Sequence, residues 1–118
     1  MDLEKTLIEA EREGWAALTT TEGGSYYREH LAADALMAFP FGVIDREQAI
    51  EAMESAPPWA EFEMRDPRVV ALTEGSGVVV YSVVARREGQ EPYRAVVSSG
   101  YALRNGAWKL AFHQQTPT

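Results

Sequence analysis

Apolar residues in the first eighteen positions recur at helical spacing. Leu3, Leu7, Ile8, Trp15 and Leu18 fall on one side of such a helix. The remaining arc is charged and holds Glu4, Lys5, Glu9, Glu11, Arg12 and Glu13. This pattern predicts an amphipathic helix whose acidic residues face water.

Two shorter helices and one strand are expected in the rest of the first half. The run Thr19 to Ser25 breaks the first helix, and Ser25 precedes a short helix over residues 26–31. Residues 35–39 alternate as a strand that ends at Pro40. Asp45 followed by Gln48 is a capping-box pattern, which predicts a helix over residues 46–54.

After Trp59 the pattern changes to alternation with period two, which is typical of strands. Pro67, Glu74 to Gly77, Gly89 to Glu91 and Asn105-Gly106 divide the segments. The expected strands cover residues 59–66, 68–73, 77–87, 93–103 and 107–115. Long strands joined by short turns predict an antiparallel meander, with the helices of the first half covering one of its faces. The fold class is therefore α+β, in a single domain over residues 1–118.

The last strand carries polar residues on both of its faces. Strict alternation places Ala111, His113 and Gln115 together with Lys109 on one face, and Trp108, Leu110, Phe112 and Gln114 on the other. A strand with apolar and polar residues on each side suits the wall of a cavity or contact with a second sheet.

Composition and charge narrow the classes of partner. Eleven basic residues against eighteen acidic ones give a net charge of −7, which disfavours nucleic acid and anionic membrane surfaces. No apolar run approaches a membrane span, and no secretory signal is visible, so we expect a cytoplasmic protein. The absence of cysteine excludes disulfides, thiolate catalysis and thiolate-bound metal.

Several local motifs resemble one known superfamily. They are Glu13-Gly14-Trp15, the run from Tyr26 to Ala35, Phe39-Pro40-Phe41-Gly42-Val43, Ala56-Pro57-Pro58-Trp59 and the run from Trp108 to Pro117. Together with the order of elements they resemble the nuclear transport factor 2-like superfamily, and more narrowly its SnoaL-like and uncharacterised bacterial members. The resemblance covers nearly the whole chain. It is specific for fold and nearly silent on function, because the superfamily holds enzymes and association domains alike.

The resemblance implies a conical barrel, also described as cystatin-like, in which a curved antiparallel sheet wraps around two or three helices and leaves an open pocket. By analogy with association-domain members, Ala111, His113 and Gln115 face the pocket with Val97, Ser99, Tyr101, Tyr81 and Val83. The expected ligand-binding residues are Trp15, Tyr27, Phe39, Trp59, Tyr81, Ser99, Tyr101, His113 and Gln115, and Phe41 could add to the apolar wall. Homodimers formed through the outer sheet face are also implied.

His113 is the one candidate for catalysis, since an imidazole in an apolar cavity can act as a general acid or base. A hydrogen bond to Ser99 or Tyr101 without chemistry is its alternative role. Isomerases and cyclases of the superfamily depend on a pocket carboxylate, but the strands after residue 77 carry no acid between Val78 and Ala85, Tyr93 and Leu103, or Ala107 and Gln115. Asp34 is the one acid expected near the pocket, although a turn role is more typical of it.

Other chemistries lack their motifs. His30 and His113 are far apart and have no paired ligand at i+4, so we predict no metal and no cofactor. Ser98 and Ser99 are not in a nucleophile elbow, which disfavours a serine hydrolase.

Three functions remain open from the sequence. The first is a small-molecule-binding domain with an apolar pocket in the cone, formed in a homodimer. The second is an isomerase, cyclase or dehydratase that uses His113 on a small apolar or keto substrate, with a tyrosine as oxyanion donor. The third is a protein-association domain. The lack of strand carboxylates favours the first over the second.

Overall fold

The computed structural model describes residues 2–118, in which three helices and two strands occupy the first half and four long strands follow. The helices are α1 (Leu3–Ala17), α2 (Gly23–His30) and α3 (Arg46–Ser55). The strands are β1 (Leu31–Phe39), β2 (Gly42–Asp45), β3 (Glu61–Thr73), β4 (Ser76–Arg86), β5 (Tyr93–Arg104) and β6 (Ala107–Pro117).

Most predicted elements are present, although some of their bounds differ. The capping box of α3 is confirmed, because Asp45 accepts from the Gln48 N–H while the Gln48 side chain accepts from the Asp45 N–H. Helix α2 begins at Gly23 rather than at residue 26, β1 begins at Leu31 rather than at residue 35, and β2 was not predicted. The two segments separated at Pro67 form one strand, β3, whose pairing with β4 shifts between Arg65 and Arg68, where Asp66 has a φ of 51°.

The six strands form one curved sheet in the order β2-β1-β6-β5-β4-β3. Neighbouring strands are antiparallel except β1 and β6, which are parallel. The sheet is thus mixed where the sequence suggested an antiparallel one. The predicted α+β cone is confirmed, and the sheet is not closed into a complete barrel.

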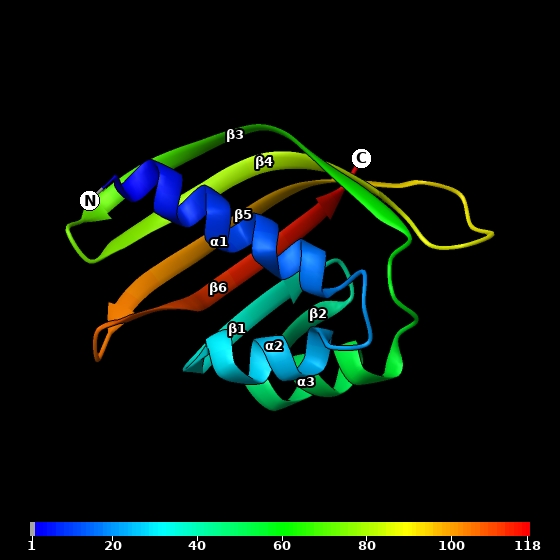
Figure 1. Cartoon of the computed structure of the whole chain (residues 1–118), viewed down its shortest axis with the longest axis horizontal. Helices are drawn as coiled ribbons and strands as arrows, with labels where there is room; N and C mark the ends of the chain where they lie inside the picture. Colours follow the sequence, from blue (N-terminus) through cyan, green and yellow to red (C-terminus); the bar gives the residue numbers. More distant parts are fainter. Residues whose placement is uncertain (1) are drawn as a thin grey trace.

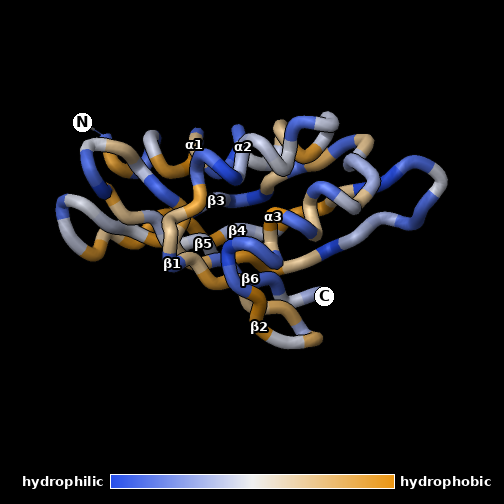
Figure 2. Tube along the Cα trace, turned by 90° about the horizontal axis from the view of Figure 1, so that it is seen from below, coloured by the Kyte–Doolittle hydropathy of each residue, from blue (hydrophilic) through white to orange (hydrophobic). Residues whose placement is uncertain are grey.

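All three helices lie on the concave side of the sheet (Figures 1 and 2). Helix α1 crosses β3 and β4, whereas α3 lies against β1 and β2 (Figure 1). Burial of Leu7, Ile50, Val79, Val83 and Val97, each at most 1% exposed, holds these layers together.

A bulge near the start of β6 changes which residues face the interior. Gly100 pairs with Phe112 and Tyr101 pairs with Leu110, so Ala111 is an extra residue opposite this step. Leu110 and His113 are therefore both buried on the concave side. The predicted alternation holds from His113 onward and is wrong before Ala111, since it placed Leu110 on the opposite face.

Gly14 brings α1 and α2 close together. A Cβ atom at Gly14 would lie 2.1 Å from the Tyr27 hydroxyl oxygen, so only glycine leaves room for that ring. Tyr27 consequently packs against α1 at the end of the concave space.

Candidate functional site

The concave space holds one fully buried acid, Glu11 of α1. Glu11 is 2% exposed, although the sequence pattern placed it on the solvent-facing arc of the helix. Glu11 follows Leu7 by four residues and precedes Trp15 by four, so the three share one face of α1 and all are buried. The assignment of Glu11 to the solvent arc was wrong. It followed from the charge of the side chain, whereas the spacing from Leu7 and Trp15 places Glu11 on the buried face.

Three hydroxyl groups from two neighbouring strands surround the Glu11 carboxylate. Ser99 Oγ donates to Oε2 over 2.6 Å and Tyr101 Oη donates to Oε1 over 2.6 Å. Tyr81 Oη also donates to Oε2 and itself accepts from Trp15 Nε1 over 2.7 Å. The buried charge is thus compensated by hydrogen bonds from neutral groups.

A second series of hydrogen bonds runs from Ser99 toward the opening of the cone. Ser99 Oγ lies 2.7 Å from His113 Nδ1, and His113 Nε2 lies 3.0 Å from Gln115 Nε2. Gln115 Oε1 accepts from Tyr93 Oη over 2.8 Å. Strand pairing produces this order, because Ser99 is opposite His113 and Val97 is opposite Gln115 on adjacent strands.

Glu11, Ser99 and His113 are the residue types of a hydrolytic triad, but their order differs. In such a triad the histidine lies between the serine and the acid. Here Ser99 lies between Glu11 and His113 and is 0% exposed, while His113 Nδ1 is 3.9 Å from Glu11 Oε2. The serine hydrogen points to the carboxylate and the oxygen cannot reach a substrate, so this arrangement does not provide a nucleophile.

Burial shifts the titration of the groups around Glu11. Desolvation lowers the pKa of His113 below its ordinary value, and the nearby Glu11 charge opposes that shift. Desolvation raises the pKa of Tyr81 and Tyr101 well above the usual range, and the Glu11 carboxylate adds to both shifts. Both tyrosines therefore remain protonated donors at neutral pH.

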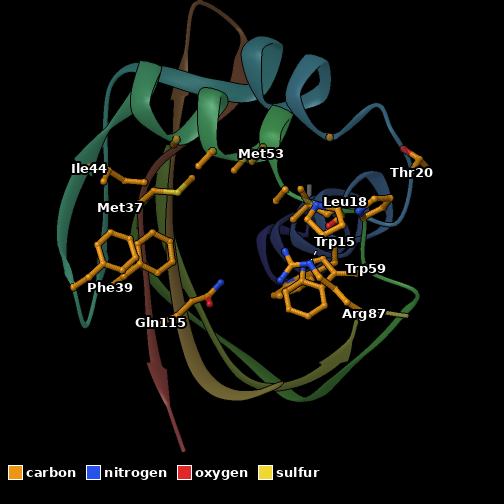
Figure 3. A pocket seen from close by; sticks show the side chains of 17 residues that line it. Trp15, Leu18, Thr20, Met37, Phe39, Ile44, Met53, Trp59, Arg87 and Gln115 are labelled. Atoms are coloured by element: carbon orange, nitrogen blue, oxygen red, sulfur yellow. Dashed lines mark hydrogen bonds between the residues drawn. The ribbon is translucent and has the colours of Figure 1, made fainter. Parts of the chain in front are cut away.

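Two adjoining cavities open beside this network. The outer one has a volume of about 260 Å³ and lies between α3, the β1–β2 hairpin and the end of α1. The inner one, about 60 Å³, reaches Glu11, Tyr27, Leu110 and His113. Both are lined by Trp15, Leu18, Met37, Phe39, Met53 and Gln115. Gln115 stands between Phe39 on one wall and the tryptophans on the other, so its amide lies at the junction of the two cavities (Figure 3).

Aromatic rings and one guanidinium group form the mouth of the outer cavity. Phe39 and Phe41 are stacked with centroids 5.2 Å apart, and Trp15 and Trp59 are 5.9 Å apart. The Arg87 guanidinium lies 3.8 Å from the centroid of the Trp59 ring. A cavity lined largely by apolar groups with few polar ones is typical of small-molecule sites.

The structure brings all nine candidate residues to the concave side, where six of them line a cavity and three do not. Trp15, Phe39, Trp59 and Gln115 line the outer cavity, and Tyr27 and His113 line the inner one. Tyr81, Ser99 and Tyr101 line neither, because their hydroxyl groups are directed at Glu11.

Asp34 lies inside β1, so neither a place near the pocket nor the favoured turn role describes it. Its side chain is 71% exposed and pairs with Arg104, 2.5 Å away, outside both cavities. The acid that lines the inner cavity, Glu11, comes from a helix rather than from a strand.

Metal-binding side chains do not gather in the site. Within residues 2–118, no group of three or more histidine, aspartate or glutamate side chains could hold an ion. Over the same residues, no helix has the length and hydrophobicity needed to cross a membrane.

Comparison with known proteins identifies the fold. No family model matches the chain, and no curated protein matches it in sequence. A nuclear transport factor 2-like protein from Cytophaga hutchinsonii has a TM-score of 0.86 and 17% identity, with 100% of both chains covered. A cystatin-like-fold protein of unknown function from Nostoc punctiforme has a TM-score of 0.82 and 16% identity, covering 100% of this chain and 93% of that one.

The association domain of C. elegans CaMKII is also similar, with a TM-score of 0.79 and 13% identity over 95% of this chain and 93% of that one. At these identities the comparisons establish the fold and leave the function open. The chain has the nuclear transport factor 2-like fold that the sequence motifs predicted.

We expect Glu11→Gln to destabilise the protein by about 1–3 kcal/mol, because an amide nitrogen would face hydroxyl groups that now donate to oxygen. Urea unfolding at pH 7.5 measures this change. Glu9→Gln, on the exposed face of the same helix, is the control and should stay within about 0.5 kcal/mol of the wild type. Equal stability of the two variants would contradict the role given to the Glu11 carboxylate.

We expect the free energy of unfolding to fall at acidic pH because of His113. Because its pKa is lower folded than unfolded, the unfolded chain binds the proton more tightly, and stability falls as pH drops below about 6.5. Between pH 7.5 and 5.5 the loss due to this group is at most about 1.4 kcal/mol. His113→Asn keeps a donor toward Ser99 without titrating, so it should lose correspondingly less stability over that range. An identical pH dependence in both proteins would refute this assignment.

Proposed function

We propose that this protein binds a small, largely apolar molecule in the paired cavities of the cone. The observation that carries the proposal is the outer cavity of about 260 Å³, which has aromatic walls and leads to the inner polar network. Apolar surface supplies affinity in such sites, and a few fixed polar groups supply orientation. The closer likeness to SnoaL-like members remains a prediction from the sequence.

The hydrogen-bond pattern favours binding over catalysis by His113. Both ring nitrogens are engaged, Nδ1 with Ser99 and Nε2 with Gln115, so no free lone pair faces the cavity. Tyr81 and Tyr101 donate to Glu11 and are therefore not available to a developing oxyanion. The Glu11 carboxylate accepts from three hydroxyl groups, so both of its oxygens are already hydrogen-bonded within the protein. An isomerase or dehydratase would need to rearrange this network first.

Ligand binding can be tested with a thermal-shift screen of apolar, aromatic and keto compounds, followed by calorimetry. A ligand at a hundred times its Kd stabilises the native state by about 2.7 kcal/mol. Ala52→Phe places a ring in the outer cavity and should abolish the shift. Ala16→Phe, at an exposed position of α1, should retain it. A hit whose shift survives Ala52→Phe would bind elsewhere and would count against the cavity.

We propose self-association as a second function, because the convex face of the sheet exposes a continuous apolar row. Val70, Val78, Gly100, Phe112 and Leu36 are paired in that order across five strands. Val70 is 54% exposed, Phe112 43% and Leu36 48%. The helices lie on the opposite side, so none of them covers this row (Figure 2). Apolar surface of this extent on a sheet is typical of an interface.

The row predicts a homodimer that a single charge should weaken. Phe112→Glu should return the mass to the 13.1 kDa of one chain in light scattering at tens of micromolar. Gln90→Glu, which makes the same charge change in the β4–β5 loop, should leave the dimer intact. A wild-type protein that is already monomeric at this concentration would overturn the proposal.

A further inference from the structure

The hydrogen-bond network has a fixed direction, set by the carboxylate at its buried end. A carboxylate only accepts hydrogen bonds, so the Ser99 hydrogen must lie between Ser99 Oγ and Glu11 Oε2, which are 2.6 Å apart. Ser99 has no second hydrogen to give. It must therefore accept from His113 Nδ1 over the 2.7 Å contact, which requires the hydrogen of the neutral imidazole on Nδ1.

The same reasoning fixes the orientation of the Gln115 amide. With the imidazole hydrogen on Nδ1, His113 Nε2 carries a lone pair and accepts from Gln115 Nε2 over 3.0 Å. Tyr93 Oη donates to Gln115 Oε1 from the other side. The Tyr93 hydroxyl can donate or accept and is compatible with this orientation, so Glu11 determines the orientation of Gln115 through Ser99 and His113.

An amide nitrogen carries two hydrogens, and His113 uses one of them. Among residues 2–118, the second has no acceptor, and Gln115 lines both cavities. We infer that this amide hydrogen recognises the ligand, which is an uncharged apolar molecule bearing a carbonyl-type hydrogen-bond acceptor. The inference rests on the proposed binding function and names the chemical class that the cavity takes.

The surroundings of Gln115 disfavour other polar ends. A ligand carboxylate in the inner cavity would meet the Glu11 carboxylate that lines it, and like charges repel. An ammonium group cannot accept from the amide hydrogen. A hydroxyl group would also need an acceptor for its own hydrogen, and the one lone pair of His113 Nε2 is already used by Gln115. A ketone, aldehyde or ester accepts from the free amide hydrogen and has no hydrogen of its own that needs an acceptor.

Two probes of similar shape separate the amide contact from apolar binding: acetophenone, which has an acceptor, and isopropylbenzene, which has none. Gln115→Leu keeps the size of the side chain and removes the donor. We expect it to weaken acetophenone binding about five- to tenfold, the value of one hydrogen bond, and to leave isopropylbenzene within about twofold. Gln114→Leu is the matched control, because Gln114 bonds to Ser98 and Thr116 instead.

Nitrogen NMR of His113 at pH 7.5 gives a readout that does not depend on any ligand. The hydrogen should be on Nδ1, and a hydrogen on Nε2 would overturn the inferred direction. If Gln115→Leu weakened the binding of both probes equally, or did not weaken the binding of acetophenone, recognition by the amide hydrogen would be overturned while the binding function stayed in place. If neither probe bound the wild-type protein at millimolar concentration, the proposed function would fail and the inference with it.

Discussion

The interior of this protein is organised by the need to keep one buried carboxylate hydrogen-bonded. An isolated charge in an apolar interior is strongly unfavourable, so Glu11 can be 2% exposed only where donors converge on it. Tyr81 and Ser99 donate to one carboxylate oxygen and Tyr101 donates to the other, while Trp15 donates to the Tyr81 hydroxyl. These residues come from α1, β4 and β5, so the carboxylate ties the helix to the middle of the sheet.

The shape of the sheet lets this hydrogen-bond network reach a cavity. The bulge at Ala111 restores alternation in a register that turns both His113 and Gln115 inward, where β1, α3 and the end of α1 leave space. Without the extra residue, Leu110 and His113 could not both face the core. The polar chain therefore begins in a fully buried region and ends at the wall of a cavity.

Periodicity was sufficient for much of the fold and for part of the site. The helices containing Leu7 and Ile50 follow from their apolar spacing, and the inward positions of Tyr81, Ser99 and Tyr101 follow from alternation along β4 and β5. The strand β2 was missed because its four residues are exposed or half-buried, so burial imposes no alternation on them. Glu11 was missed although its spacing from Leu7 and Trp15 placed it on the buried face, because the hydroxyl groups that make a buried carboxylate tolerable lie seventy or more residues away. The bulge depends on pairing between strands, which no single strand encodes.

The tryptophans at the mouth of the outer cavity can also report on binding through their fluorescence. Of the three tryptophans, Trp15 and Trp59 line the outer cavity and lie 5.9 Å apart, with Arg87 stacked on the second. Indole emission depends on the polarity and the charges next to the ring. A molecule that entered the cavity would contact two of the chain's three indoles, while Trp108, outside both cavities, would remain as an internal reference. Occupancy of the cone can accordingly be followed by intrinsic fluorescence, without a label on either molecule.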